Sequence, residues 1–356
     1  MEKYKNLRNF WKNKKVLVTG HTGFKGSWMC IMLNLLGAKI YGYSLKPEKT
    51  SLFNQSKCSN FLKKNFYSDI RNEKKLYKII NQVKPEILFH LAAQPLVTEG
   101  FENPIDTFNT NIIGTLNVLN SIKKCRSIRS AVIITTDKVY KTKNINRFYS
   151  ENDELGGVDP YSASKVCAEI ITNSFIKSYY SKTIHENKIS SARSGNVVGG
   201  GDYAKNRLLP DIIKSINSNK KLKVRNPNHI RPWQHVIEPT FGYLKLAQFQ
   251  YDNKLKKIDA SWNFGPNKKS FVKVIDIINK ISKVKNIKIK INNKIKFSET
   301  KVLKLNNSKA KKYLKWKPKW DLNKCLNNVI EWNERFKKSN NAKEICENQI
   351  INYLNK

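Results

Sequence analysis

The stretch Lys15–Ser27, KVLVTGHTGFKGS, decides the expected fold. A short apolar run that favours a strand leads into three glycines at a spacing of three, namely Gly20, Gly23 and Gly26. An apolar helical pattern follows, stops at Gly37, and gives way to a second β-like run at 39–43. This order predicts a strand, a tight turn, a helix and a second parallel strand.

Each glycine of the turn has its own expected role. Gly20 permits the turn, Gly23 lets the backbone approach a pyrophosphate, and Gly26 lets the helix pack closely on the strand. The first turn of the helix offers free N–H groups and a positive dipole end to phosphate oxygens. The spacing predicts a dinucleotide-binding loop, and a purely structural turn is the alternative.

The composition is typical of a soluble globular protein of about two domains, since the chain has 356 residues of which 40% are hydrophobic. No apolar run approaches the ~20 residues of a membrane span, and the charged N-terminus lacks the apolar centre of a signal peptide. We therefore expect a cytoplasmic protein without a membrane partner. The six cysteines show no CxxC pair and no metal-ligand spacing, so we expect reduced thiols and no bound metal.

The net charge of +40 raises the question of nucleic-acid binding. The lysines are spread along the chain, mostly as singles and pairs, which does not favour a dedicated basic patch. We therefore expect no nucleic-acid partner, and a nucleotide- or RNA-binding protein without catalysis is the alternative from a different functional class. The positive field would still attract an anionic small substrate.

Strand-like and helix-like segments alternate as far as residue 193. This order predicts an α/β fold with a doubly wound parallel sheet, in which ligands bind beyond the carboxyl ends of the strands. From about Ser194 the alternation fails, so we expect a second, smaller mixed α/β lobe that includes an exposed strand over 287–297. The predicted division is a dinucleotide-binding domain over 1–193, to which the chain returns around 236–258, and a substrate lobe over 194–235 and 259–356.

Tyr161 and Lys165 lie four apart in YSASK, on the same face of one predicted helix. A phenol is a poor base at neutral pH, and an adjacent ammonium lowers its pKa by favouring the phenolate. The lysine can also hold the ribose hydroxyls of a dinucleotide. We expect this pair to be catalytic, together with Thr136 at the end of a neighbouring strand. An ordinary surface placement is the alternative.

These motifs resemble those of the extended short-chain dehydrogenase/reductases, which share the glycine loop, Asp69-Ile70, Leu91-Ala92-Ala93, Asn111 and YSASK. Longer motifs are similar to the CDP-glucose 4,6-dehydratase family: HTGFKGSW, HLAAQPLV, DPYSASK, RSGNVVGGGD, NRLLPD and RNPNHIRPWQHV. The resemblance covers about residues 10–332. It implies a Rossmann fold and a homodimer that associates through the helices expected at 107–123 and 161–179. It also implies a tightly bound NAD, held by Gly20, Thr22, Gly23, Phe24, Gly26, Asp69, Ile70, Leu91, Ala92, Ala93, Tyr161 and Lys165.

The resemblance further implies a lyase that converts CDP-glucose to CDP-4-keto-6-deoxyglucose and water, for deoxysugar synthesis. The C5 hydrogen of a hexose becomes acidic only after C4 is oxidised, so the site needs a hydride store, a tyrosine and a second acid/base pair. Asp137 and Lys138 are expected to be that pair, with Thr136 bound to the C4 oxygen. If Lys138 is the base, it must be uncharged when it acts; alternatively it stays charged and stabilises the enolate while Asp137 serves both proton steps. A 4-epimerase, or a dehydratase for another nucleotide, is the nearest alternative.

The resemblance also implies a set of substrate contacts. Arginine forks suit the geometry of a diphosphate, and structural salt bridges are the alternative for each of them. One departure concerns the cofactor, because the second strand ends in YSLK without the carboxylate that usually accompanies NAD. Lys46 could instead suit a 2′-phosphate, but the family favours NAD, which we expect. The residues expected to contact the substrate are Gln94, Asn196, Arg207, Arg225, Arg231 and His235.

Overall fold

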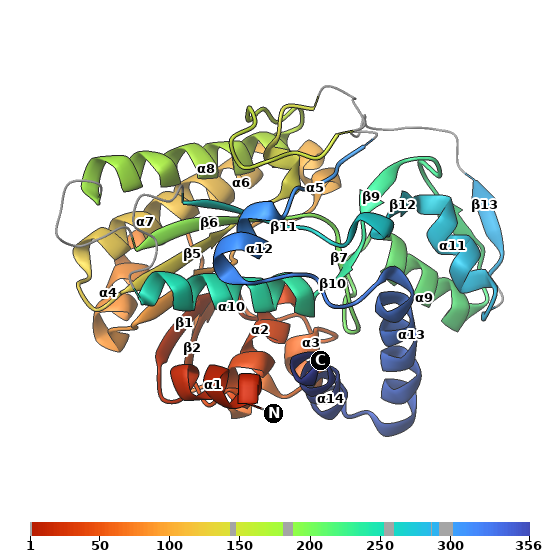
Figure 1. Cartoon of the computed structure of the whole chain (residues 1–356), viewed down its shortest axis with the longest axis horizontal. Helices are drawn as coiled ribbons and strands as arrows, with labels where there is room; N and C mark the ends of the chain where they lie inside the picture. Colours follow the sequence, from red (N-terminus) through yellow and green to blue (C-terminus); the bar gives the residue numbers. More distant parts are fainter. Residues whose placement is uncertain (1, 143–146, 181–187, 253–259, 286, 292–301) are drawn as a thin grey trace.

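The expected parallel sheet has seven strands in the order β11-β6-β5-β4-β1-β2-β3 (Figure 1). The computed structural model describes residues 2–142, 147–180, 188–252, 260–285, 287–291 and 302–356. All neighbouring strands of the sheet pair in parallel, with Val16 opposite both Ile40 and Ile87. The strands are β1 (Lys15–Thr19), β2 (Lys39–Ser44), β3 (Lys64–Tyr67), β4 (Ile87–His90), β5 (Ser130–Ile134), β6 (Ile189–Ser194) and β11 (Ser261–Phe264).

Both faces of the sheet are buried, because successive side chains of a strand point to opposite sides. Val16 and Val18 lie in one hydrophobic cluster and Leu17 in the other. The first cluster contains side chains of α1 (Glu2–Trp11), α2 (Phe24–Leu35), α10 (Ile237–Tyr251), α12 (Ser308–Leu314) and α14 (Ala342–Asn355). The second contains side chains of α4 (Glu73–Val83), α7 (Gly114–Lys124) and α8 (Pro160–Tyr179). This is the doubly wound arrangement that the sequence predicts.

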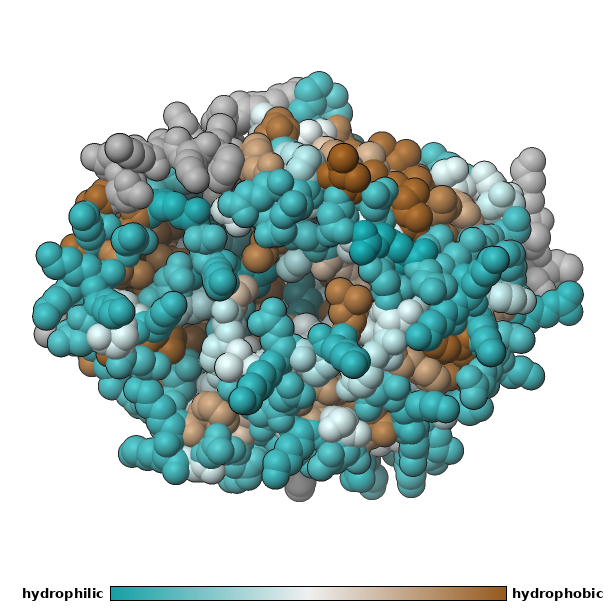
Figure 2. Space-filling view, turned by 180° about the vertical axis from the view of Figure 1, so that it is seen from behind, coloured by the Kyte–Doolittle hydropathy of each residue, from teal (hydrophilic) through white to brown (hydrophobic). Residues whose placement is uncertain are grey.

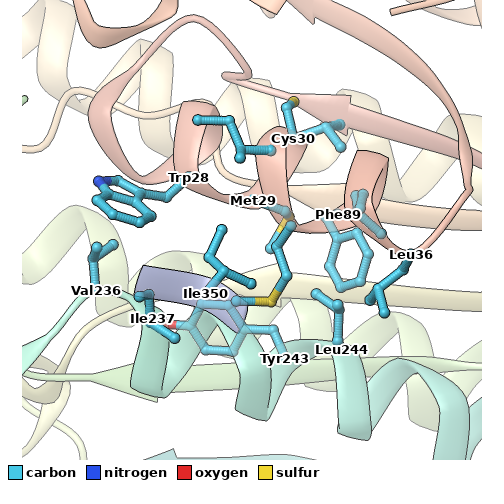
Figure 3. Packing of buried hydrophobic residues seen from close by; sticks show 14 of the residues in the cluster. Trp28, Met29, Cys30, Leu36, Phe89, Val236, Ile237, Tyr243, Leu244 and Ile350 are labelled. Atoms are coloured by element: carbon cyan, nitrogen blue, oxygen red, sulfur yellow. The ribbon is translucent and has the colours of Figure 1, made fainter. Parts of the chain in front are cut away.

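The packing of α2 fixes the position of the glycine loop. Figure 3 shows Met29 of this helix among Phe89 of β4, Tyr243 of α10 and Ile350 of α14. These residues are fully buried, so α2 is held against the sheet by contacts with three other parts of the chain. The C-terminal helix α14 therefore supports the loop from a distance of more than 300 positions in the sequence.

A second lobe lies to one side of the sheet (Figure 1). It has its own hydrophobic cluster, which includes Leu209, Trp233 and Ile277. Its helices are α9 (Leu208–Ser218), α11 (Val274–Ser282) and α13 (Leu322–Ser339). Its strand pairs are β8 (Leu222–Val224) with β13 (Ile289–Ile291) and β9 (Ile230–Pro232) with β12 (Phe271–Lys273), and β7 (Val197–Val198) with β10 (Gln234–His235) connects it to the sheet domain.

Several elements differ from the sequence-based expectation. Strand β11 and helix α14 fall within 259–356, yet they pack with the seven-stranded sheet and its helices. The helix expected over 107–123 is divided into α6 (Pro104–Phe108), the π-helical turn η2 (Asn109–Ile113) and α7. Of the strand expected over 287–297, only β13 is found, and 292–301 lie outside the described residues. The remaining short helices are α3 (Leu52–Gln55), η1 (Cys58–Asn60), α5 (Val97–Glu102), η3 (Asp137–Val139) and η4 (Lys268–Ser270).

One face of the molecule is mostly hydrophilic. Figure 2 shows hydrophilic residues spread over the whole of one face, with smaller hydrophobic patches and a hollow near its centre. Among the described residues, no helix is both long and apolar enough to span a bilayer.

Candidate active site

The glycine loop has one open position between two crowded ones. A Cβ on Gly20, where φ is +71°, would lie 2.6 Å from the backbone nitrogen of Ala92, and a Cβ on Gly26 would lie 2.2 Å from the carbonyl oxygen of Gly20. Gly23 is exposed, and a Cβ there would meet only the Gly20 carbonyl, at 3.4 Å. Gly20 and Gly26 are therefore required by the fold of the loop, whereas Gly23 keeps a cradle open above it.

This cradle leads to the start of α2. Gly23 is the N-cap residue of the helix, and no side chain caps it. The N–H groups of the first turn are thus available to an external acceptor, and the helix dipole favours a negative one. The loop and the helix end together fit the pyrophosphate of a dinucleotide.

The other predicted cofactor residues surround the carboxyl ends of β1 to β4. Thr22 bonds to Ser44 through their hydroxyls at 2.8 Å and donates to the carbonyl of Leu45, which ties the loop to β2. The Asp69 carboxylate is engaged by Arg71, with Nη2 of Arg71 at 2.6 Å from Oδ2 of Asp69, a contact that we did not predict. The remaining predicted residues at this edge are half-buried or buried: Phe24, Ile70, Leu91, Ala92 and Ala93.

Tyr161 and Lys165 lie on the first turns of α8, where Asp159 caps the helix by accepting a hydrogen bond from the Ser162 backbone. Both side chains are buried, and Lys165 donates to the carbonyl of Ile134 at the end of β5 (3.3 Å). Burial raises the pKa of Tyr161 to about 12, although a hydrogen bond with Thr136 lowers it. Burial also lowers the pKa of Lys165 to about 8. Burial therefore raises the pKa of Tyr161, whereas we expected Lys165 to lower it.

Thr136, Asp137 and Lys138 follow β5, and Thr136 caps the short helix η3 that the other two begin. Asp137 is 1% exposed, its Oδ1 accepts a hydrogen bond from the Thr136 hydroxyl at 3.2 Å, and its Oδ2 has no hydrogen-bond partner among the described residues. Burial raises the pKa of the Asp137 carboxyl, against the charge of Lys138, which lowers it. The site thus holds a buried carboxyl with a raised pKa beside a half-buried lysine.

Two arginines of the second lobe lower the pKa values of these catalytic candidates through their positive charge. Arg231 is buried on β9, contacts Nδ1 of His229 at 3.0 Å, and lowers the pKa of Asp137 through its charge. Arg207 precedes α9, forms an ion pair with Asp202 at 3.3 Å, and lowers the pKa of Tyr161. Arg225 is exposed and donates to the Asn206 carbonyl, next to Arg207 in the chain. The fold therefore brings arginines of the second lobe to the groups at the end of β5.

The structure gives less support to three of the residues that we predicted to contact the substrate. Gln94 uses both ends of its side-chain amide locally, donating to Thr107 at 2.8 Å and accepting from the Leu96 backbone. His235 is 0% exposed and packs edge-on against Trp28 and Trp320, a position that favours a role in the core. Asn196 is half-buried just after β6, where its carbonyl accepts a hydrogen bond from the Gln234 backbone.

Two polar clusters next to the site were missed by the sequence analysis. Glu169 on α8 forms a buried ion pair with Arg193 at 2.8 Å and accepts hydrogen bonds from Thr135 and Ser191, which anchors the ends of β5 and β6. Glu169 follows Lys165 at the same four-residue spacing, so helical periodicity could have indicated it. The second cluster contains Lys25 of the glycine loop, whose ammonium donates hydrogen bonds to Ser194 and Tyr243. In the sequence Lys25 is simply a lysine among apolar and small residues, so no local pattern indicates this cluster.

The site offers titratable groups of three kinds beside the cradle for a dinucleotide. The arrangement supports proton transfer at a phenol, a carboxyl and an amine, contributed by Tyr161, Asp137 and Lys138. Within the described part of the chain, no group of three or more His, Cys, Asp or Glu side chains is placed to hold a metal ion.

Comparison with known proteins agrees with this geometry. The model of the GDP-mannose 4,6 dehydratase family matches residues 17–329, nearly the whole sheet domain and second lobe. The chain belongs to the GDP-mannose 4,6 dehydratase family. It is 39% identical to a CDP-glucose 4,6-dehydratase of Salmonella typhimurium over 353 residues, with 98% of each chain covered. A UDP-glucose 4-epimerase of Mycoplasma genitalium is 24% identical over 76% of this chain and 82% of its own.

The fold of this member of the GDP-mannose 4,6 dehydratase family is shared with solved structures. The dTDP-glucose 4,6-dehydratase of Bacillus anthracis, solved in complex with NAD, superposes with a TM-score of 0.74 over 91% of this chain and 98% of its own, at 23% identity. The family match and the parallel sheet confirm the predicted family and the predicted fold class.

Proposed function

We propose that this protein is a CDP-glucose 4,6-dehydratase that converts CDP-glucose to CDP-4-keto-6-deoxyglucose and water. The observation that carries this proposal is the buried Asp137 carboxyl beside Lys138 at the end of β5, next to Tyr161. An enzyme that only oxidises and reduces C4 has no use for a second acid/base pair. The Salmonella relative supports the choice of nucleotide and sugar.

We propose NAD as the resident cofactor. Gly20, Gly23 and the first turn of α2 would hold its pyrophosphate, and Lys165 would hold a ribose, while Asp69 is already paired with Arg71. When bound, NAD would supply reversible hydride transfer, for the oxidation of the sugar at C4 and the reduction at C6. Because the hydride returns within one turnover, the site needs a retained cofactor and no external reductant.

The proton steps belong to residues of the chain. Tyr161 accepts the proton of the C4 hydroxyl, and Thr136, which lowers the pKa of Tyr161 by a hydrogen bond, also holds the C4 oxygen. Lys138 removes the C5 proton that the adjacent ketone has made acidic, and it returns a proton to C5 when the hydride is delivered to C6. Asp137, whose pKa is raised by burial, gives its proton to the departing C6 hydroxyl, which leaves as water. Arg207 and Arg231 bind the diphosphate.

The test is product formation by the purified full chain. With CDP-glucose and no added reductant, we expect the alkali-absorbing 4-keto-6-deoxy product. A panel of dTDP-glucose, GDP-mannose and UDP-glucose under the same conditions should give much slower conversion. Formation of CDP-galactose would instead identify a 4-epimerase, and faster turnover of another nucleotide sugar would reassign the substrate.

We also propose a homodimer that associates through helices on the α8 side of the sheet, where α6, α7 and α8 lie together (Figure 1). This surface carries several exposed apolar side chains, namely Ile105, Ile113, Leu116, Ile170 and Tyr179. Such residues normally mark a contact surface when they gather on one face. By light scattering, Ile170→Asp should shift the protein toward the monomer, whereas Val284→Asp, an exposed position in the second lobe, should not.

We propose a cytoplasmic location. All six cysteines are unpaired, and five of them are buried, which suits a reducing compartment. A protein recovered from the cell with native disulfides would contradict this location.

A further inference from the structure

The acid/base segment, residues 136–138, has only long hydrogen bonds within itself. The Lys138 N–H reaches the Thr136 hydroxyl at 3.4 Å, and the Tyr140 N–H reaches the Asp137 carbonyl at 3.5 Å. Both distances exceed those of ordinary N–H···O bonds, so these contacts hold the segment weakly. The position of its side chains therefore depends on contacts with the elements around it.

One buried ion pair binds side chains on both flanks of the acid/base segment. Glu169 and Arg193 are each 3% exposed, and Nη2 of Arg193 lies 2.8 Å from Oε2 of Glu169. On one flank, the Thr135 hydroxyl donates to Oε1 of Glu169 at 2.5 Å. On the other flank, Nη1 of Arg193 donates to the Tyr140 hydroxyl at 2.9 Å, and this hydroxyl donates to Oδ1 of Asn263 at 2.7 Å. The segment is thus fixed at both ends by side chains bound to the same pair.

The same ion pair connects the segment to the helix that carries Tyr161. Tyr161, Lys165 and Glu169 follow one another at a spacing of four on α8, which places them on one face of the helix. Lys165 donates to the carbonyl of Ile134, and Glu169 accepts from the next residue, Thr135. Two successive turns of α8 therefore bind two successive residues at the end of β5, which sets the position of the acid/base segment relative to Tyr161.

We propose that Glu169 and Arg193 are positioning residues that hold the acid/base segment at a fixed distance from Tyr161. This inference rests on the proposed function, because only a dehydratase needs proton transfer at C4 and at C5 and C6 of one bound sugar. Proton transfer requires the two heavy atoms to lie at hydrogen-bond distance. A displacement of about 1 Å can lower the rate by about a hundredfold. Neither residue of the pair takes part in a proton step itself.

The test removes the two flanking hydroxyls and leaves the ion pair intact, because loss of one partner would leave a buried charge unpaired. Thr135→Val deletes the hydroxyl bound to Glu169, and Tyr140→Phe deletes the hydroxyl bound to Arg193. Each variant should lower kcat for CDP-glucose by about tenfold to a hundredfold, with KM changed by less than about twofold, because the proposed diphosphate contacts are untouched. Thr135→Ser keeps the hydroxyl and should restore kcat.

The matched control is Ser261→Ala. The Ser261 hydroxyl also accepts a hydrogen bond from Arg193, at 3.1 Å, but Ser261 belongs to β11 at the edge of the sheet and does not flank the acid/base segment. Its loss should lower the melting temperature, as the loss of either flanking hydroxyl should, yet leave kcat within about twofold of the wild type. Thermal unfolding of all four variants measures the structural cost separately from kcat.

The outcomes separate this inference from the proposed function. Folded Thr135→Val and Tyr140→Phe proteins with wild-type kcat would overturn the inference, as would an equal loss of kcat in Ser261→Ala or a loss that Thr135→Ser does not restore. Either flanking variant suffices if the other fails to fold. A wild type that dehydrates no nucleotide sugar overturns the proposed function and this inference together. A wild type that dehydrates a different nucleotide sugar overturns only the substrate, and the same comparison of kcat with that sugar then decides the inference.

Discussion

Asp137 lies directly against Gly195: a Cβ on residue 195 would stand 2.7 Å from Oδ2 of Asp137. That oxygen is buried and has no hydrogen-bond partner among the described residues. The loop after β6 thus leaves space for the Asp137 carboxyl, and any side chain at position 195 would occupy that space. The same Cβ would also lie 2.3 Å from Pro232, so it could not move away without displacing β9.

Gly195→Ala should therefore displace Asp137 and lower kcat by about tenfold or more, because small shifts of an acid from its proton acceptor are costly. The overpacking should cost about 1–3 kcal/mol of stability, measured by thermal unfolding. Gly156→Ala is the control, since its Cβ would meet only Lys141, outside the site. Unchanged kcat in Gly195→Ala would show that the position of Asp137 is not critical.

Alanine substitution should impair dinucleotide binding at Gly23 and stability at Gly26. Gly23→Ala should keep its stability within about 1 kcal/mol but lose dinucleotide affinity, because its Cβ fills the open cradle. Gly26→Ala should be strongly destabilised, because its Cβ would lie 2.2 Å from the Gly20 carbonyl. Titration with NADH and thermal unfolding of both variants distinguish the two effects. Normal NADH binding by Gly23→Ala would remove the cradle as the pyrophosphate site.

Tyr161→Phe should lower kcat by a factor on the order of 100 to 10,000 with an unchanged fold, since the proton acceptor at the C4 oxygen is lost. Thr136→Val should act more mildly. It removes the hydrogen bond that lowers the Tyr161 pKa, so the rise of rate with pH should move to higher pH. Retention of the full rate by Tyr161→Phe would refute the assigned role.

Asp137 and Lys138 can be separated by hydrogen exchange at C5 in deuterated water. Asp137→Asn should block loss of the C6 hydroxyl but still allow exchange at C5, because the base remains. Lys138→Met should lose both exchange and product. Exchange that persists in Lys138→Met but stops in Asp137→Asn would favour the other arrangement, in which Asp137 serves both proton steps.

Glu238 should make stability depend on pH. Its carboxylate accepts hydrogen bonds from the Lys319 and Trp320 backbone and from Tyr353 of α14, and burial raises its pKa from 4.5 to about 7. The folded state therefore binds this proton more tightly than the unfolded state, and the resulting stabilisation is lost as the pH rises from 4.5 to about 7. The loss is at most on the order of 3 kcal/mol.

Glu238→Gln should remove this part of the pH dependence, because the amide does not titrate. Its oxygen can accept from both backbone N–H groups, and its NH2 can donate to the Tyr353 hydroxyl. The measurement is thermal unfolding of both proteins at several pH values across that range. A parallel decline in both would show that other groups are responsible.

Much of the fold could be predicted because its signals are local. The glycine spacing, the strand before it and the helix after it determined β1, α2 and β2, and the four-residue spacing of Tyr161 and Lys165 placed both on one face of α8. The position of Asp137 at the end of a strand was likewise readable from the sequence. Turn chemistry and periodicity act over a few residues, so sequence alone is sufficient for them.

The tertiary structure decided which groups are buried together, and hence their chemistry. Lys25 reaches Ser194 and Tyr243 across 169 and 218 positions of the chain, and no local pattern reports such contacts. Burial raised the pKa of Tyr161 where spacing alone predicted the opposite, and it placed His235 in the core. Desolvation depends on every element packed around a group. The pKa shifts therefore follow from the packing of α10, α14 and the second lobe against the sheet.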